Sequence, residues 1–575
     1  MTPRAVMHSL SRASKRKYAP PNVLISCSDM KKLVLALGVV ACVLLAAEQV
    51  DVATVAKIRS EEMEHSQVMY IEHMLADRYG PRVTGTPNHE AAAKWAVAEM
   101  TKWGMKNGHL EKWDYGRDGW LNERAYGFIT APVKENLKFE VLAWTPSTNG
   151  TVAASAIELV PPRGPEVPPD PNARGGRGGG RGPQYLPPTK EEFAQWLTAN
   201  KDKVRGKMVL MGKAAVIPVD FDPPVKRTPD DRIKEQYDPE HPQGRGFGGG
   251  RGRGPEDPTR MDTREMAKQI DQMLIEGGAV MRLNDAARGN GIIVAQANAA
   301  YDITKAVPTV IVRNDDYGRI ERLLADGDDV KLEFNIVNHT YPEGKTSYNA
   351  IAEIPGSDKA DEVVMLGGHL DSWHAATGAT DNGIGSAIMI EAIRVIQSMG
   401  LKPRRTIRVA LWSGEEEGLL GSLAYVKEHF GTAENPKPEW FKLDCYFNVD
   451  TGTGRIRGAS IFGPPEAAAA LRPVFLQFED FGVGGINVTN SRQTGGTDST
   501  SFNNAGLPGV GAQQDPIEYN SLTHHTNLDT YERIIPDDVK KDAAIIAAAV
   551  WHAANREEMI PRFTKETMPA YVEPR

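Results

Sequence analysis

The sequence predicts an α/β protein built on a sheet with helices on both faces and interrupted by a smaller, β-rich domain. Segments with the hydrophobic patterns of strands and helices alternate from Asn349 onward, which is typical of such a sheet. Several of the predicted strands end in histidine or acidic residues. Between about 137 and 345 the composition changes and two glycine–arginine tracts appear. Together these observations predict a sheet with chemistry at its strand ends and an inserted domain.

Composition and charge exclude several broad classes of protein. At 575 residues with 41% hydrophobic content the chain can bury a large core, and its length predicts roughly two to four domains. The net charge of -8 is mild, so it favours neither a nucleic-acid-binding nor a membrane-surface role. The three cysteines, Cys27, Cys42 and Cys445, supply no disulfide framework, since the first two lie in a segment that we expect to be removed.

The N-terminal residues 1–47 have the pattern of an export signal. Lys31-Lys32 precede an apolar run from 33 to 47, which Glu48 ends. Because a bilayer span needs roughly 20 apolar residues, we expect a cleaved signal peptide, export to the periplasm or the medium, and no stable membrane span after processing. The stretch Val39-Val40-Ala41-Cys42 resembles a lipobox, so a lipoprotein anchor at Cys42 is the less favoured alternative.

The main domain is expected in two parts, 48–136 and 346–575. In the first part, residues 66–75 and 89–103 have helical spacing, and a strand-like pattern begins at 111. In the second part, strands are predicted at 361–370, 406–412, 444–450, 486–489 and 508–513, and helices at 384–399, 423–429, 465–478 and 539–554. Functional residues are expected where those strands end.

Residues 137–345 are expected to form the inserted domain. Its predicted strands are 204–211, 278–283, 291–295 and 307–312, and its predicted helices are 264–275 and 317–325. The glycine–arginine tracts at 174–181 and 245–254 cannot bury enough apolar surface to offset the entropy of ordering, so we expect mobile surface loops. An RNA-binding role for the tracts is disfavoured in an exported protein, and no nucleic-acid partner is expected.

Metal-ligand residue types recur after four of the predicted strands. They are His369, Asp371 and Asp381, then Glu415 and Glu416, then Asp450, and finally His525. Each alone is a weak signal, because a lone loop histidine is more often solvated and a glutamate run is usually the start of a helix. Their recurrence at successive strand ends, in one order along the chain, predicts a metal site.

The local sequences around these residues resemble peptidase family M28, a family of co-catalytic zinc exopeptidases. The resemblance rests on GHLDS at 368–372, GATDNG at 378–383, Glu415-Glu416 before GLLGS at 418–422, NVD at 448–450 and HTNLDT at 525–530. The contexts are most similar to the carboxypeptidase Q-like branch, and the insertion resembles a protease-associated domain. The resemblance implies the zinc exopeptidase fold, in which helices flank both faces of a mixed sheet.

The resemblance also implies a role for each residue and two zinc ions as cofactors. His369 and Asp450 would hold one ion, Glu416 and His525 the other, and Asp381 would bridge the two. Glu415 would be the general base. Asp371 would accept a hydrogen bond from the ring nitrogen of His369 that does not bind zinc, and so fix its tautomer.

These roles agree with the chemistry of the residues. Zinc binds imidazole nitrogen and carboxylate oxygen well. Two ions about 3.5–4 Å apart need a bridging carboxylate, and a bridging hydroxide supplies a nucleophile at neutral pH. Adjacent Glu415 and Glu416 cannot both face the metals in an extended segment, so one is expected to bind metal while the other accepts the proton of the water.

The predicted activity is the hydrolysis of short peptides by an exported exopeptidase. Aminopeptidase, dipeptidase and carboxypeptidase directions remain open, and a homodimer is plausible. Two alternatives use the same scaffold: a non-catalytic binding protein, which the filled ligand positions disfavour, and a one-zinc acyltransferase resembling glutaminyl cyclases. Zinc content and the release of free amino acids from dipeptides distinguish these readings.

Several neighbouring residues are predicted to have less direct roles. Glu417 is expected to be a solvated residue at the positive end of the following helix, and His374 a solvated loop residue. His524 is a candidate wall residue of the cleft, and Tyr519 a candidate for binding the substrate carbonyl. Asp498 resembles a family position near the active site, although Ser499 stands where the family often has a histidine.

Overall fold

The computed structural model describes residues 50–167, 184–219, 226–240 and 257–571. The expected export signal at 1–47, Cys42 and most or all of each glycine–arginine tract lie outside the described residues. Within the described ranges, every helix is too short or too polar to cross a membrane.

The first sheet has eight strands in the order β1-β12-β14-β13-β17-β20-β18-β19. Their bounds are β1 Lys106–Asp114, β12 Thr346–Ile354, β13 Lys359–His369, β14 Arg405–Trp412, β17 Leu443–Asn448, β18 Ile456–Phe462, β19 Ile486–Thr489 and β20 Gly509–Gln514. The four central strands, β14, β13, β17 and β20, are parallel, whereas β1, β12 and β18 pair with their inner neighbours in antiparallel fashion. The sheet is therefore mixed, as predicted.

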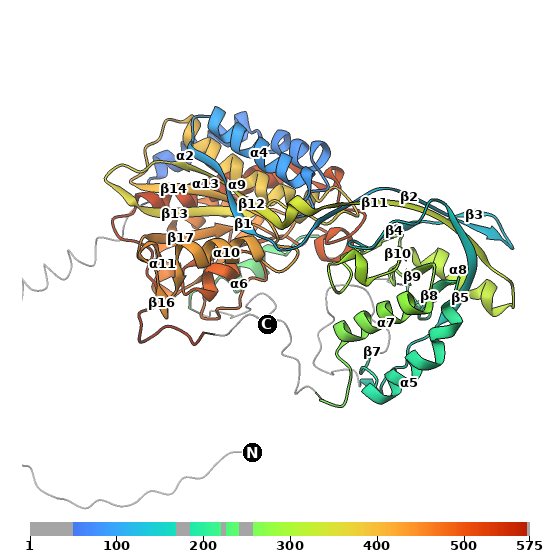
Figure 1. Cartoon of the computed structure of the whole chain (residues 1–575). Helices are drawn as coiled ribbons and strands as arrows, with labels where there is room; N and C mark the ends of the chain where they lie inside the picture. Colours follow the sequence, from blue (N-terminus) through green and yellow to red (C-terminus); the bar gives the residue numbers. More distant parts are fainter. Residues whose placement is uncertain (1–49, 168–183, 220–225, 241–256, 572–575) are drawn as a thin grey trace, which may run out of the picture. The chain divides into compact units, whose positions relative to one another are not determined.

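Helices cover both faces of this sheet, which confirms the predicted fold class. On one face lie α2 Val52–His65, α3 Val68–His73, α4 Pro87–Lys102, α9 Ile384–Ser398, α11 Pro465–Phe475 and α13 Pro536–Asn555. On the other face lie α10 Leu420–His429 and α12 Ser499–Asn504. Figure 1 shows α4 and α9 on the opposite side of β12 from α10. Because the central strands are buried on both faces, they read as continuous apolar runs, such as 363–366 in β13.

A second eight-stranded sheet has the order β3-β2-β11-β5-β8-β9-β10-β4. Its strands are β2 Gly119–Ala131, β3 Glu135–Asn136, β4 Phe139–Val141, β5 Val152–Leu159, β8 Met208–Met211, β9 Met281–Asp285, β10 Thr309–Val312 and β11 Lys331–Tyr341. Helices α5 Lys190–Asn200, α7 Thr263–Gly277 and α8 Asn314–Ala325 belong to the same region. The remaining short elements are α6 Asp230–Gln236, β6 Glu166–Val167, β7 Gln184–Tyr185, β15 Gly431–Thr432 and β16 Asn435–Pro436.

Two sequence expectations for this region differ from the structure. The expected boundary at 137 lies inside the second sheet, because β2 and β3 precede it and β2 pairs along its length with β11. The strand expected at 291–295 does not form: this segment is a loop that makes a single bridge, from Val294 to Thr526 of the main domain. Its apolar residues Ile293 and Ala295 are buried in a small separate cluster instead.

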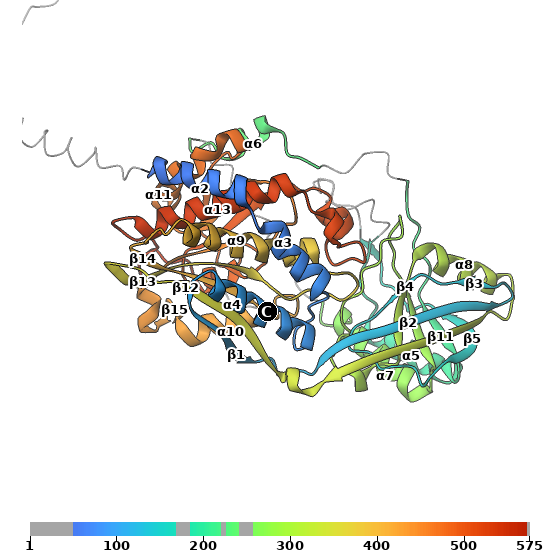
Figure 2. The same cartoon turned by 90° about the horizontal axis from the view of Figure 1, so that it is seen from above.

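The chain passes between the two sheets twice, from β1 to β2 and from β11 to β12. Figures 1 and 2 both show β2 and β11 running side by side. At this crossing Gly119 and Gly344 pack against the backbone of Gly85, and a Cβ on either would lie 1.9 or 2.0 Å from the Gly85 carbonyl oxygen. Only glycine fits such a close backbone approach.

Candidate metal centre

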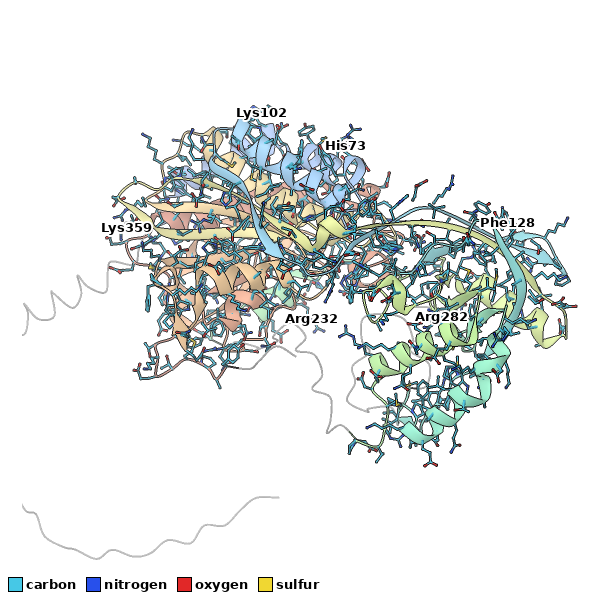
Figure 3. The ribbon with its side chains drawn as sticks, in the orientation of Figure 1. His73, Lys102, Phe128, Arg232, Arg282 and Lys359 are labelled. Atoms are coloured by element: carbon cyan, nitrogen blue, oxygen red, sulfur yellow. The ribbon has the colours of Figure 1, made fainter. Side chains whose placement is uncertain are left out.

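The predicted site residues come together at the carboxyl edge of the first sheet. His369 is the last residue of β13, and Glu415 and Glu416 follow β14. Asp450 follows β17, and His525 comes after the turn Tyr519–Thr523 beyond β20. These strands are parallel neighbours, so their ends meet at one edge. Lys359, which Figure 3 labels, begins β13 and marks the opposite edge.

Two groups of acid and histidine side chains share one aspartate. In the first group, His369 Nε2 lies 3.5 Å from Asp450 Oδ1, 3.5 Å from Asp381 Oδ1 and 3.9 Å from Glu415 Oε2. In the second, His525 Nε2 lies 2.9 Å from Glu416 Oε2 and 3.2 Å from Asp381 Oδ2. Asp381 thus turns one carboxylate oxygen toward each group.

His524 extends the second group. Its Nε2 lies 3.7 Å from Asp381 Oδ2, and its ring stacks on that of His525 with 3.7 Å between centroids. The His524 side chain keeps 39% of its surface exposed, whereas that of His369 keeps 1%. His524 is therefore a wall residue of the cleft, in a position from which its ring nitrogen can reach the shared aspartate.

Buried carboxylate oxygens in this cluster lack hydrogen-bond donors. Asp381 Oδ2, Glu416 Oε1 and Asp450 Oδ1 are buried with no hydrogen-bond partner among the described residues. Buried carboxylates are costly unless they are paired or coordinate a metal. Imidazole nitrogens and carboxylate oxygens are also the donor set that zinc prefers. The residues therefore fit divalent cations, one beside each histidine.

The electrostatics of the cluster are those of crowded acids held apart from water. Burial raises the pKa of Glu415 and of Glu416 well above the usual glutamate value, and neighbouring carboxylates add to both shifts. Burial lowers the pKa of His369, but Asp450 and Glu415 outweigh this and leave it well above its usual value. Burial likewise opposes ionisation of Asp381, yet His525 and His369 hold the pKa of this carboxyl below its usual range.

The Asp371 carboxylate lies nearer to the backbone of the glutamate pair than to the His369 ring. His369 Nδ1 lies 3.0 Å from the main-chain carbonyl oxygen of Asp371, whereas the nearer carboxylate oxygen is 3.7 Å away. The carboxylate instead accepts hydrogen bonds from the backbone N–H groups of Glu415 (3.3 Å) and Glu416 (3.2 Å). Asp371 therefore positions the glutamate pair, and its backbone orients His369.

Two neighbours expected to be solvated are instead packed. Glu417 Oε2 is buried without a hydrogen-bond partner among the described residues, and burial raises the pKa of Glu417 to about 8. His374 Nε2 donates to the Val141 carbonyl oxygen at 2.6 Å, and its ring meets that of Trp120 edge-on at 5.0 Å. Both side chains lie where the loops of the first sheet meet other parts of the fold, which local sequence does not reveal.

The cluster opens into a cleft. Beside the acids and histidines, its walls include Leu419, Thr451, Gln514, Tyr519 and Asn520. The described residues that line it include no lysine or arginine. Asp498 lies behind the cleft, fully buried, and burial raises the pKa of Asp498 to about 7.

Arg82 is a structural residue of the site that the sequence did not indicate. Its guanidinium is buried and donates to four backbone carbonyl oxygens: those of Leu370 (2.6 Å), Leu75 (2.8 Å), Thr377 (2.9 Å) and Gly378 (2.9 Å). Three of these carbonyls belong to the loop that joins His369 to Asp381. Arg82 thus fixes the path of this loop from the outside.

Replacing Arg82 with methionine is expected to destabilise the protein by at least about 3 kcal/mol. The change leaves several buried carbonyls without donors, and each unsatisfied buried group costs about 1–3 kcal/mol. Arg82→Lys keeps the charge and part of the hydrogen bonding, so its loss should be smaller. Urea unfolding followed by circular dichroism measures both. Equal stability of the methionine variant and the parent would contradict this structural role.

The fold is a mixed α/β sheet, and its carboxyl edge carries two acid–histidine groups that suit divalent cations. Residues 349–550 match the model of Peptidase family M28. The match covers the four central strands and every candidate ligand, and it confirms the resemblance seen in the sequence.

Similar proteins agree with this match. The chain is 32% identical to carboxypeptidase Q of Rattus norvegicus over 256 residues, which cover 44% of this chain and 52% of that protein. It is 34% identical to carboxypeptidase Q of Xenopus laevis over 264 residues, covering 45% and 53%. It is 28% identical to leupeptin-inactivating enzyme 1 of Streptomyces exfoliatus over 228 residues, covering 36% and 49%. The chain spans about half the length of the curated relatives that it matches.

Solved structures share the fold over a longer stretch. A peptidase M28 precursor from Shewanella amazonensis superposes with a TM-score of 0.59 at 22% identity, covering 89% of this chain and 99% of that one. A zinc aminopeptidase from Bacillus subtilis superposes with a TM-score of 0.50 at 17% identity, covering 87% and 97%. At such identities the likeness establishes the fold alone.

Proposed function

We propose that this protein is an exported exopeptidase that hydrolyses short peptides with two zinc ions. The observation that carries the proposal is the placement of Asp381, with one oxygen toward each of two acid–histidine groups. The ions would be held by His369 and Asp450 on one side, by Glu416 and His525 on the other, and by Asp381 between them. When bound, such ions supply a nucleophilic water at neutral pH and polarise the substrate carbonyl.

In this proposal Glu415 is the general base and then the general acid. Its Oε2 faces the first group, 3.9 Å from His369 Nε2, and the side chain borders the cleft. It takes a proton from the attacking water and delivers it to the leaving amine. The Asp371 carboxylate holds the Glu415 backbone N–H at 3.3 Å, and so keeps this side chain in place. Tyr519, whose pKa burial raises well above its usual value, stays protonated and can donate to the substrate carbonyl oxygen.

We further propose that the enzyme recognises the free amino group of its substrate. The described lining of the cleft carries acidic groups, Asp381, Glu415, Glu416 and Asp450, but no lysine or arginine. With two zinc ions bound, the charge of the ions offsets that of these four acids, so the proposal rests on the lack of a fixed cation: a free carboxylate meets no lysine or arginine of the described lining. Aminopeptidase or dipeptidase action is accordingly favoured over the carboxypeptidase direction that the relatives' name suggests.

A panel of blocked dipeptides tests the direction of cleavage. The protein should hydrolyse a dipeptide amide with a free amino group, should fail on the same dipeptide acetylated at its amino end, and should lose both metal and activity after chelation. Zinc should restore the activity. Cleavage of the acetylated dipeptide with a free carboxylate, and not of the amide, would show a carboxypeptidase. Zinc analysis of the purified protein also tests the one-metal, cyclising alternative.

Export is part of the proposal and rests on the pattern of residues 1–47. We also propose that the inserted region is a protease-associated domain and that the protein forms a homodimer. Fractionation of cells that express the full chain tests export: the mature protein should be found outside the cytoplasm with its N-terminus beyond residue 47. An unprocessed N-terminus on cytoplasmic protein would contradict it.

A further inference from the structure

Gln296, in the inserted region between β9 and β10, contacts the His525 ring. Its side-chain amide nitrogen, Nε2, lies 2.9 Å from His525 Nδ1, while Nε2 of the same ring faces Glu416 and Asp381. The two residues are 229 positions apart in sequence. A ring whose Nε2 holds a cation carries its proton on Nδ1 and needs an acceptor there. A half-turn of the amide places the Gln296 carbonyl oxygen where it accepts that proton.

The loop that carries Gln296 also bonds to Thr526 and Asn527, the two residues that follow His525. Val294 forms a backbone bridge with Thr526. Ile293 N–H donates to Asn527 Oδ1 at 2.8 Å, and Asn527 N–H donates to the Ile293 carbonyl oxygen at 3.0 Å. The Asn527 amide donates to the Gly291 carbonyl oxygen at 3.2 Å. The backbone on the C-terminal side of His525 is therefore held by the insertion.

These ties matter because His525 has an unusual backbone conformation. Its φ is +60°, in the left-handed region that side chains other than glycine rarely adopt. Such a conformation is unfavourable for a residue with a side chain and persists only when the surrounding structure holds it. The bridge at Thr526 and the bonds at Asn527 supply that support, and Gln296 then sets the orientation of the ring.

The insertion holds Gln296 itself in place. The Ala143 N–H donates to the Gln296 carbonyl oxygen at 2.9 Å, and Asn298 N–H donates to the Ala143 carbonyl oxygen at 3.0 Å. Asn298 is buried, and its side-chain amide also donates to the Trp144 carbonyl oxygen. Truncation of the Gln296 side chain leaves these backbone bonds intact.

We propose that Gln296 is a positioning residue of the metal centre, through which the inserted region orients His525 for one of the two cations. The inference rests on the proposed function, since it assigns a partner to a proposed ligand. It gives the insertion a direct part in building the site. The affinity for the ion beside His525 and Glu416 should depend on Gln296, whereas the affinity for the ion beside His369 and Asp450 should not.

The affinity of the full-length protein for each zinc ion, measured by competition with a chromophoric chelator, tests this. Gln296→Ala should lower the affinity for the ion beside His525 and Glu416 by roughly tenfold or more, the range found when such outer partners of metal-bound histidine are removed. The affinity for the other ion should not change. Gln296→Glu should restore the affinity or exceed that of the parent, because a carboxylate accepts the same proton. Gln269→Ala is the matched control, since among the described residues its amide donates only to Glu265 on α7.

Each possible result of these measurements either supports the inference or overturns it. Selective weakening by Gln296→Ala, rescue by Gln296→Glu and an unchanged thermal midpoint of the metal-free variant support the inference. Equal affinities of Gln296→Ala and the parent for both ions, no rescue by glutamate, or an equal loss in Gln269→Ala would overturn it. A parent protein that binds only one zinc ion would overturn the two-metal proposal as well, which separates the two failures.

Discussion

Glu415→Gln is expected to lower kcat by roughly a thousandfold or more while the protein keeps two zinc ions. General acid–base catalysis contributes typically 10²–10⁴-fold, and Glu415 is proposed both to take the proton of the water and to deliver it to the amine. Glutamine has nearly the same shape but cannot carry that proton. Because Glu416, His525, His369, Asp450 and Asp381 remain in place, the metal content should not change.

The measurement combines steady-state hydrolysis of a dipeptide amide with zinc analysis of the same sample. Glu417→Gln is the matched control two residues away. Burial raises the pKa of Glu417 to about 8, so at pH 7 this side chain is mostly protonated and glutamine replaces it with little change in charge. Its kcat should stay within a few-fold of the parent. A Glu415→Gln variant with near-parental kcat would remove Glu415 from the mechanism.

Much of the fold around the site could be predicted from local patterns. The central strands are buried on both faces, so they read as apolar runs such as 363–366, and α9 and α13 follow as long apolar helices. The pairing of strands that are distant in the sequence could not be predicted. The segment 119–131 has a strand pattern that fits either sheet, and only its pairing with β11, some two hundred positions later, places it in the second one. Local sequence carries no record of that choice.

The candidate ligands could be predicted because each follows a parallel strand of one sheet, so a list of strand ends is also a list of neighbours. Their supporting residues could not. Arg82 acts through backbone carbonyls, which every residue offers. Gln296 lies in a loop without a motif, and only the folded structure brings it next to His525. The carboxylate of Asp371 has two possible partners within reach, the His369 ring and the Glu415–Glu416 backbone, and local sequence does not show that the second is the nearer one.

Asp381→Ala is expected to remove both zinc ions and to lower kcat/KM by at least roughly a thousandfold. Within the described part of the chain, Asp381 is the one side chain with an oxygen in both groups, 3.5 Å from His369 Nε2 and 3.2 Å from His525 Nε2. Metal ions supply several kcal/mol of transition-state stabilisation, and each 1.36 kcal/mol corresponds to about tenfold in rate. Without the shared carboxylate, two like charges would also lose the anion that separates them.

Comparison with single-group variants makes this prediction sharp. Asp450→Ala should mainly lower the affinity for the ion beside His369, and His525→Ala the affinity for the ion beside Glu416. Asp381→Ala should lower both affinities in one titration. Asp498→Asn is the matched control, because Asp498 is equally buried yet belongs to neither group, so both ions should stay bound. If Asp381→Ala kept one ion at parental affinity, the aspartate would serve a single site, and the arrangement of two groups around a shared carboxylate would not describe the working enzyme.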